Sequence, residues 1–289
     1  MDIGALRIFM AVAEAESVSQ AAERLFCVQS NVTTRVRHLE DELGTKLFYR
    51  KKRGMALTPS GKILLKYAEQ IIRLTADAEK AVRSTGQVRG PLAIGTMEST
   101  AAVHLPAILA RYCQQYPEVD LSLTTGTTEE LVVKVLNYQL DGAFVGGAVQ
   151  HADIAQEPIF NEELVLVTKD RIESVETIIN PTVLVFRRGC TYRAILENWL
   201  RETGMLPFKI IEFGTLEAIL GCVVAGMGIT LFPRSIIAKL NYVDKVKLHE
   251  IPEVLGRVPT MFIRRQDTFL TQAMDAFLLS IKQGAKAPI

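Results

Sequence analysis

The chain has 289 residues, of which 48% are hydrophobic and 22% charged, and its formal net charge is +1. This length is too great for one ordinary core and suits a small module joined to a larger domain. The composition excludes a disordered chain, and no apolar run approaches the roughly 20 residues of a membrane span. Asp2 and Glu14 stand where a secretory signal would be basic or continuously apolar, so we expect a cytoplasmic protein.

Cysteine and histidine are too scattered to suggest a metal site or a disulfide framework. The positions are Cys27, Cys113, Cys190, Cys222, His38, His104, His151 and His249, with no CxxC pair. Buried thiols are the ordinary interpretation of such cysteines. We therefore expect no metal and no cofactor.

Basic residues are concentrated in one part of the N-terminal region. Between Val28 and Lys66 there are nine basic residues and three acidic ones. The basic residues are Arg35, Arg37, Lys46, Arg50, Lys51, Lys52, Arg53, Lys62 and Lys66; the acidic ones are Glu40, Asp41 and Glu42. This excess fits a polyanionic partner, although a solvated basic face is also common, and charge alone does not decide between them.

The first 44 residues predict three short helices. Apolar residues spaced at 3 and 4 predict a helix over 3–15, and Ser19 can cap a second helix over 20–25. A third helix is expected over 29–43, with Gly44 as its left-handed C-cap. Its buried residues should be Val32, Val36, Leu39 and Leu43. Three helices with a tight turn at 26–28 indicate a helix-turn-helix.

The exposed face of the third helix and the segment after it have the chemistry of a DNA-binding surface. The helix presents hydrogen-bonding side chains that can contact base edges in the major groove. A small hairpin follows, with a basic tip at 50–54 suited to phosphates. The candidate DNA-binding residues are Ser17, Ser19, Gln29, Ser30, Thr33, Thr34, Arg37, Arg50, Lys51, Lys52 and Arg53.

A long helix should begin at Thr58 and Pro59, where threonine provides a cap and proline suits the first helical position. An apolar stripe with spacings of 3 and 4 runs along this helix: Leu64, Tyr67, Ile71, Leu74, Ala78 and Ala81. The stripe could be a core face, but its regularity next to a DNA-binding module favours pairing of two subunits. We expect the first five of these residues to form the dimer contact.

Residues 11–65 read AVAEAESVSQAAERLFCVQSNVTTRVRHLEDELGTKLFYRKKRGMALTPSGKILL. This run resembles the N-terminal domain of LysR-type transcriptional regulators in three motifs: the FxxVAExxSxxxAAexL opening, the LExxLGxxLFxR core and the LTPxG start of the long helix. Val28-Gln29-Ser30 replaces the common Ser-Gln-Pro, so the capping serine of the third helix is missing. The resemblance implies a winged helix-turn-helix that binds operator DNA. It also implies a homodimer, and a tetramer made of two dimers.

The remaining residues alternate between short apolar strands and helices, which predicts parallel βαβ units and an α/β fold. Strands are expected at 92–96, 119–124, 142–145, 164–167, 183–186, 209–213 and 258–263, and helices at 101–115, 129–140, 192–201, 215–225 and 268–281. The resemblance adds a two-lobed domain shaped like a periplasmic binding protein, which senses a small-molecule effector.

The expected domains combine this α/β pattern with the resemblance. They are a DNA-binding domain over 1–58, a linker helix and hinge over 59–89, and an effector-binding domain over 90–289. By the resemblance, one lobe holds about 91–160 and 262–289, and the other about 161–261.

An enzyme, or a small-molecule-binding α/β protein with a basic N-terminal arm, is the alternative. Gly226-Met227-Gly228 begins like a dinucleotide fingerprint, but Leu231 occupies the place of the third glycine. The sequence has no GxSxG or Walker motif. We therefore expect no catalytic residues.

Three junctions between strands and helices could hold a small polar or anionic effector. Helix starts offer unpaired N–H groups, and ligands of open α/β sheets gather at the carboxyl ends of strands. Helix capping alone would also explain serine and threonine at such places. The candidate effector-binding residues are Ser99, Thr100, Thr128, Cys190 and Thr191, with Arg187 and Arg188 as weaker candidates.

Overall fold

The computed structural model describes residues 1–51, 54–83, 88–172, 178 and 180–285. The chain divides into two compact units, residues 1–85 and 86–289. Each unit is built around apolar cores of its own. Within the described ranges, no helix combines the length and the apolarity that crossing a membrane requires.

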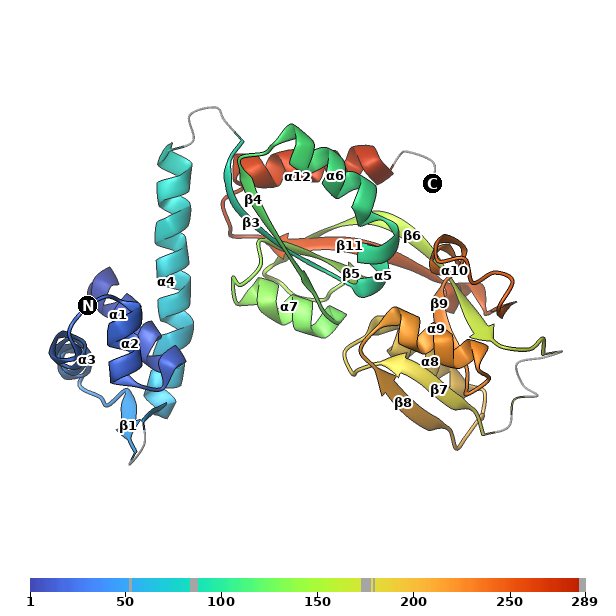
Figure 1. Ribbon diagram of the computed structural model, residues 1–289, viewed down its shortest axis with the longest axis horizontal. Helices are drawn as coiled ribbons and strands as arrows, with labels where there is room; N and C mark the ends of the chain where they lie inside the picture. Colours follow the sequence, from blue (N-terminus) through green and yellow to red (C-terminus); the bar gives the residue numbers. More distant parts are fainter. Residues whose placement is uncertain (52–53, 84–87, 173–177, 179, 286–289) are drawn as a thin grey trace. The chain divides into compact units, whose positions relative to one another are not determined.

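The first unit contains three short helices, a hairpin and a long helix (Figure 1). Its elements are α1 (Ile3–Ala15), α2 (Val18–Arg24), α3 (Gln29–Leu43), β1 (Phe48–Arg50), β2 (Met55–Leu57) and α4 (Pro59–Arg83). Leu6, Phe9, Val32 and Leu39 are buried at the centre of this unit. The predicted helix-turn-helix and hairpin are therefore confirmed.

Two details of the predicted helices are wrong. Ser17, not Ser19, caps α2, because its extended backbone lets the Ser17 hydroxyl accept the N–H of Gln20 at 3.4 Å. Ser19 lies within the first turn and is exposed. Leu43 was expected in the core but is 40% exposed, whereas Glu40 on the same helix is buried.

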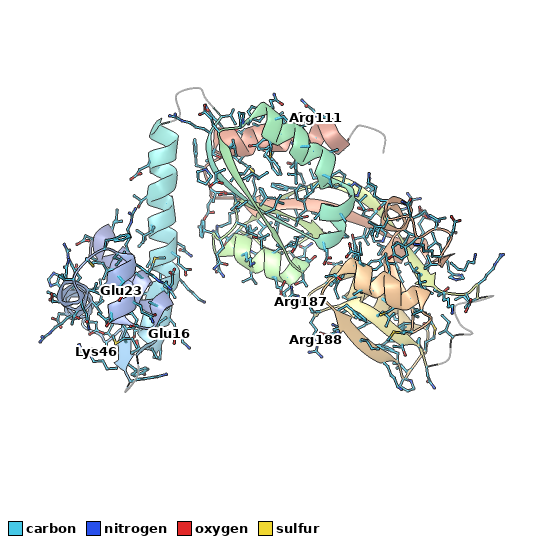
Figure 2. All side chains as sticks on the ribbon, viewed as in Figure 1. Glu16, Glu23, Lys46, Arg111, Arg187 and Arg188 are labelled. Atoms are coloured by element: carbon cyan, nitrogen blue, oxygen red, sulfur yellow. The ribbon has the colours of Figure 1, made fainter. Side chains whose placement is uncertain are left out.

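Glu40 connects α3 to the hairpin. One of its carboxylate oxygens accepts the backbone N–H groups of Leu47 at 2.9 Å and Phe48 at 3.3 Å. The other accepts the ammonium of Lys46, labelled in Figure 2, at 2.8 Å. Burial disfavours the charged carboxylate, but the three hydrogen bonds outweigh it and lower the pKa of Glu40.

The second unit consists of two α/β lobes. Its elements are β3 (Gly90–Thr96), α5 (Glu98–Val103), α6 (Leu105–Gln115), β4 (Val119–Thr125), α7 (Thr128–Leu136), β5 (Gly142–Gly146), β6 (Ile154–Thr168), β7 (Thr182–Phe186), α8 (Thr191–Glu202), β8 (Lys209–Phe213), α9 (Leu216–Val224), β9 (Thr230–Pro233), α10 (Arg234–Lys239), β10 (Lys247–Glu250), α11 (Glu253–Gly256), β11 (Arg257–Arg265) and α12 (Gln272–Ala285). Strands β3, β4 and β5 with helices α6, α7 and α12 form the first lobe, and β7 to β10 with α8 to α10 form the second (Figure 1).

Strand β6 belongs to both lobes. Its residues 154–163 pair antiparallel with β11, which also pairs with β5 of the first lobe. Its residues 164–168 pair with β9 and β10 of the second lobe. The chain therefore enters the second lobe along β6 and returns to the first through β11.

The helix expected over 101–115 is interrupted. The structure has α5 and α6 instead, separated at His104, because Pro106 near the start of α6 has no N–H to continue the helical ladder. Ser99 and Thr100 were expected to precede a helix, but they lie in the first turn of α5, which is capped at Met97.

Other boundaries also differ from the sequence prediction. Helix α7 ends at Leu136 rather than 140, because the backbone of Tyr138 turns left-handed with φ of 58°. Helix α12 begins at Gln272 rather than 268. The prediction missed β9, α10, β10, α11 and the first part of β6.

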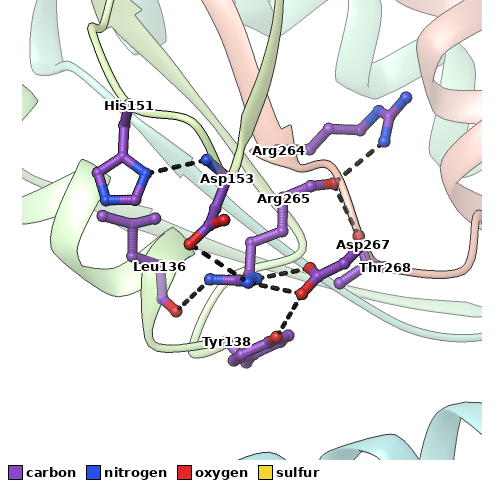
Figure 3. Close-up of polar contacts among 8 residues, drawn as sticks. All are labelled: Leu136, Tyr138, His151, Asp153, Arg264, Arg265, Asp267 and Thr268. Carbon is purple, nitrogen blue, oxygen red and sulfur yellow. Dashed lines mark hydrogen bonds and ion pairs between the residues drawn. The ribbon is translucent and has the colours of Figure 1, made fainter.

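A charged cluster joins the end of β11 to the end of α7 and the start of β6 (Figure 3). The guanidinium of Arg265 donates to both carboxylate oxygens of Asp267, at 2.7 and 2.6 Å, and to the carbonyl oxygen of Leu136 at 3.1 Å. It stacks over the Tyr138 ring at 4.2 Å and lies 3.8 Å from Asp153. The hydrogen bond from Arg265 lowers the pKa of Asp267 to about 2, so this cluster is charged at neutral pH.

Replacing Glu40 should destabilise the first unit. Glu40→Ala leaves the buried N–H groups of Leu47 and Phe48 without an acceptor, which should cost about 2 kcal/mol of unfolding free energy. Urea denaturation measures this change. Asp41→Asn removes a charge from an exposed neighbour and should change stability by less than about 0.5 kcal/mol. Equal effects of the two variants would contradict the connecting role of Glu40.

The lowered pKa of Glu40 also sets a pH dependence. A carboxyl whose pKa is lower in the folded state stabilises the fold above its usual value of 4.5 and loses that contribution as the pH falls through the folded pKa. The stability difference between the parent and Glu40→Gln should therefore shrink below about pH 4.5. Denaturation midpoints at pH 7 and pH 3.5 check this, and a constant difference would contradict it.

Candidate functional site

The exposed face of α3 is the first candidate site. Gln29, Ser30, Thr34 and Arg37 are exposed, and Thr33 is half-buried, with its hydroxyl donating to the carbonyl oxygen of Gln29 at 3.0 Å. The helix starts after Val28, whose side chain makes no capping hydrogen bond. The missing cap predicted from the sequence is therefore observed, and no capping side chain covers the positive end of the helix dipole.

The hairpin is the second part of this surface. Arg50 and Lys51 are exposed, whereas Lys52 and Arg53 lie outside the described residues. Gly54 has φ of 89°, and a Cβ on it would lie 2.6 Å from the carbonyl oxygen of Glu16. Only glycine fits there, so the backbone at residue 54 lies directly against the end of α1. Ser17, the residue after Glu16, caps α2 with its side chain, while Ser19 is exposed.

The apolar residues of α4 face two directions. Leu64 and Ile71 pack against the core of the first unit, together with the fully buried Ala68. Tyr67 and Leu74 are 59% and 69% exposed, and Ala78 is exposed as well. Ile63, at 61% exposure, lies on the same side, four residues before Tyr67. The sequence prediction missed Ile63 because spacing alone does not say which of two adjacent faces the module covers.

A cleft that is partly open to solvent lies between the two lobes. Its lining comes from the first lobe at Met97, Glu98, Ser99, Thr125, Gly126, Thr127 and Thr128, and from the second at Phe186, Arg187, Cys190, Tyr192 and Gly214. Most of these residues follow strands or begin helices, which is where open α/β sheets bind ligands.

Thr128 and Thr191 connect the lobes beside the cleft. The Thr191 hydroxyl donates to the carbonyl oxygen of Gly146 at 2.9 Å and lies 3.0 Å from the hydroxyl of Thr128. The N–H of Gly146 donates to Thr128 at 3.2 Å. The structure thus brings together two predicted residues from different lobes. Cys190 precedes α8 without a capping hydrogen bond, and burial raises the pKa of its thiol.

One buried hydroxyl in the cleft lining, and one outside the lining, lack hydrogen-bond partners among the described residues. Tyr192 is buried, and its hydroxyl forms no hydrogen bond with the described residues, although it is near Ser99 and Thr260. Burial raises the pKa of Tyr192, so the phenol stays neutral. Thr100 is buried with an unpartnered hydroxyl but is absent from the lining, unlike Ser99.

The cleft lining includes one carboxylate and one guanidinium. Glu98, on α5, accepts the N–H of Leu216 at the start of α9 at 3.1 Å, and burial raises the pKa of Glu98. Arg187 follows β7 and lies 3.6 Å from the carboxylate of Glu130 on α7 (Figure 2). Arg188 is outside the cleft lining. Among the described residues, no group of three His, Cys, Asp or Glu side chains is arranged to hold a metal ion.

Two family models match this chain. The "LysR substrate binding domain" matches residues 85–286, and the "Bacterial regulatory helix-turn-helix protein, lysR family" matches residues 3–62. The chain belongs to the LysR family of transcriptional regulators. The resemblance of the N-terminal motifs to this family is therefore confirmed.

Individual LysR-family proteins are similar to this one over nearly the full length. The HTH-type transcriptional regulator GltR of Bacillus subtilis is 48% identical over 98% of this chain and 96% of its own. A full-length OxyR variant of Pseudomonas aeruginosa has a TM-score of 0.72 at 21% identity, with 98% of each chain covered. Full-length CbnR, solved in complex with its target DNA, has a TM-score of 0.68 at 22% identity, covering 98% of this chain and all of that one. These structures share the fold.

Several cleft residues of this LysR-family regulator, among them Met97, Glu98 and Tyr192, were not identified as candidates from the sequence. Glu98 and Tyr192 adjoin predicted residues but lie in first helical turns, and Met97 caps α5. A signal was available for Tyr192, because a tyrosine next to a strand-to-helix junction combines an apolar ring with a hydroxyl that needs a partner when buried. Glu98 gave no such signal, because acidic residues are common in first turns.

The exposed side of α4 should hold two LysR-family chains together. Leu74→Glu places two carboxylates in an apolar contact, so the variant should sediment as a monomer and bind operator DNA at least tenfold more weakly. Analytical ultracentrifugation and DNA titration measure both effects. Leu74→Met keeps the apolar area and should leave both unchanged. A dimeric Leu74→Glu protein with parental DNA affinity would show that this side of α4 is not an interface.

Proposed function

We propose that this LysR-family regulator binds operator DNA as a homodimer and that a small polar metabolite in the interlobe cleft changes its DNA binding. Residues 1–58 form the DNA-binding domain, 59–89 the linker helix and hinge, and 90–289 the effector-binding domain. Within the last domain, one lobe holds about 91–160 and 262–289, and the other about 161–261. Two dimers associate through their effector-binding domains.

The main support for DNA binding is the start of α3, which is exposed and has no side-chain cap. Gln29, Ser30 and Thr34 are exposed at this end, so they can reach base edges while free backbone N–H groups meet a phosphate. Arg50 and Lys51 on the hairpin add sequence-independent contacts to the backbone. CbnR, which has the same fold, was solved with its target DNA.

A dimer predicts the spacing between the two half-sites of the operator. Two copies of α3 that enter the major groove from one side of the duplex require half-sites one helical turn, or a multiple of it, apart. The exposed side of α4, with Ile63, Tyr67 and Leu74, supports this pairing.

The predicted base contacts can be tested by substitution in α3. Gln29→Ala or Thr34→Ala should reduce the preference for operator over random DNA by about 1–3 kcal/mol if a bidentate base contact is lost. Fluorescence anisotropy with both DNAs measures this preference. Glu23→Gln, exposed on α2, is the control and should retain the preference. Equal losses on both DNAs for the α3 variants would contradict base recognition.

The hairpin should contribute through phosphate contacts alone. Arg50→Gln or Lys51→Gln should weaken binding to operator and random DNA to a similar extent. Each lost phosphate contact should flatten the slope of log affinity against log salt by about one unit. Titrations from 50 to 200 mM salt, roughly the range in which such contacts dominate, measure the slope. An unchanged slope, or a loss confined to the operator, would contradict the assignment.

A further inference from the structure

The two charged side chains in the cleft lining constrain the charge of its ligand. Glu98 comes from the first lobe and Arg187 from the second, and the other lining residues are uncharged at neutral pH. From this arrangement we infer that the effector is an α-amino acid, whose ammonium binds Glu98 and whose carboxylate binds Arg187. This inference rests on the proposed function of the cleft as the effector site.

Glu98 disfavours a ligand that is only anionic. Its carboxylate is half-buried, and among the described side chains none forms an ion pair with it. The N–H of Leu216 satisfies one acceptor position, whereas a carboxylate can accept about four hydrogen bonds. Burial and the nearby carboxylate of Glu217 raise the pKa of Glu98, and the charge of Arg187 and the hydrogen bond from Leu216 offset this rise only in part. A ligand ammonium would supply both the charge and the missing donors.

Arg187 supplies a matching site for a carboxylate. Its contact with Glu130 is long, at 3.6 Å, and the Arg187 side chain is 62% exposed, so the guanidinium can reorient toward a ligand. A guanidinium can hold a ligand carboxylate through two parallel hydrogen bonds. Helix α8, twelve residues long, begins beside it at Thr191 without a side-chain cap and adds a positive dipole.

The unpartnered hydroxyl of Tyr192 is an independent sign of a polar ligand. This side chain lines the cleft, and only 3% of its surface is exposed. A buried hydroxyl without a partner costs free energy unless a ligand or water completes it. Ser99, which also lines the cleft, and Thr260 lie near the same hydroxyl.

A purely structural role for Glu98 makes a different prediction. The carboxylate could serve only to hold the start of α9, although Thr215 already caps that helix by accepting the N–H of Ala218 at 3.3 Å. Glu98→Gln keeps an oxygen that can accept from Leu216 and removes the charge. The variant therefore separates holding α9 from binding a cation.

The test is calorimetric titration of the full-length protein with the twenty proteinogenic L-amino acids. Each binder is then compared with the analogous carboxylic acid without the amino group and the amine without the carboxylate. At least one amino acid should bind, and both analogues should bind at least tenfold more weakly. Failure of all twenty to bind, or equal binding of the carboxylic acid, would overturn the inference.

Variants at Glu98 and Arg187 test which charged group of the ligand each residue binds. Glu98→Gln should weaken binding of the amino acid at least tenfold and leave binding of the carboxylic acid unchanged or tighter. Glu118→Gln, at an exposed position between α6 and β4, should change neither affinity. Arg187→Gln should weaken binding of the amino acid at least tenfold and leave binding of the amine unchanged. Arg188→Gln, outside the cleft lining, is the control and should change neither affinity. Parental amino-acid binding by either cleft variant would overturn the inference, provided that thermal unfolding shows both to be folded.

Operator binding distinguishes this inference from the proposed function. Gel shifts with DNA from upstream of the protein's own gene measure operator binding without any ligand. A chain that binds operator but no amino acid would overturn the effector class and leave the DNA-binding function intact. A chain that binds no DNA specifically would overturn the proposed function, even if the cleft binds an amino acid.

Discussion

The continuity of β6 through both lobes is the constraint on which the second unit depends. The strand pairs with β11 in the first lobe and with β9 and β10 in the second, so neither lobe can move far without bending this ladder. Glu162, at the changeover, accepts from Ser235 of α10 at 2.9 Å and lies 2.6 Å from the His104 ring. The lobes can therefore rotate about this point but cannot slide past each other, which fixes the position of the cleft.

Because of this arrangement, side chains from several segments of the chain line the same cleft. Thr128 and Thr191 meet beside it, while Glu98 and Arg187 add one charge from each lobe. A ligand can bias one arrangement of the lobes only through a difference in its affinity for the alternatives. Groups contributed by both lobes provide such a difference, because they converge on a ligand only when the lobes are close.

The sequence predicted the elements whose signals are local. Period and caps identified α1, α3 and α4, and Gly44, with φ of 63°, ends α3 as expected. Contacts between residues distant in the chain could not be predicted from local patterns. Glu40 is buried because the backbone of Leu47 and Phe48 folds against it. Likewise, only the packing of the module shows which side of α4 stays exposed. Short strands such as β9 and β10 have too few residues for a period to be recognised, and Glu98 and Tyr192 acquire meaning only when the lobes face each other.

Leu64 and Ile71 pack against the same core as α3, so helix α4 is in direct contact with the DNA-binding module. This packing sets the direction in which the exposed Tyr67 and Leu74 point relative to α3. Each residue of an α-helix advances that rotation by about 100°. One residue inserted between Ile71 and Leu74 would rotate Leu74 and the residues after it by about a quarter of a turn relative to Tyr67. In evolution, this segment should tolerate substitution far more readily than any change in its length.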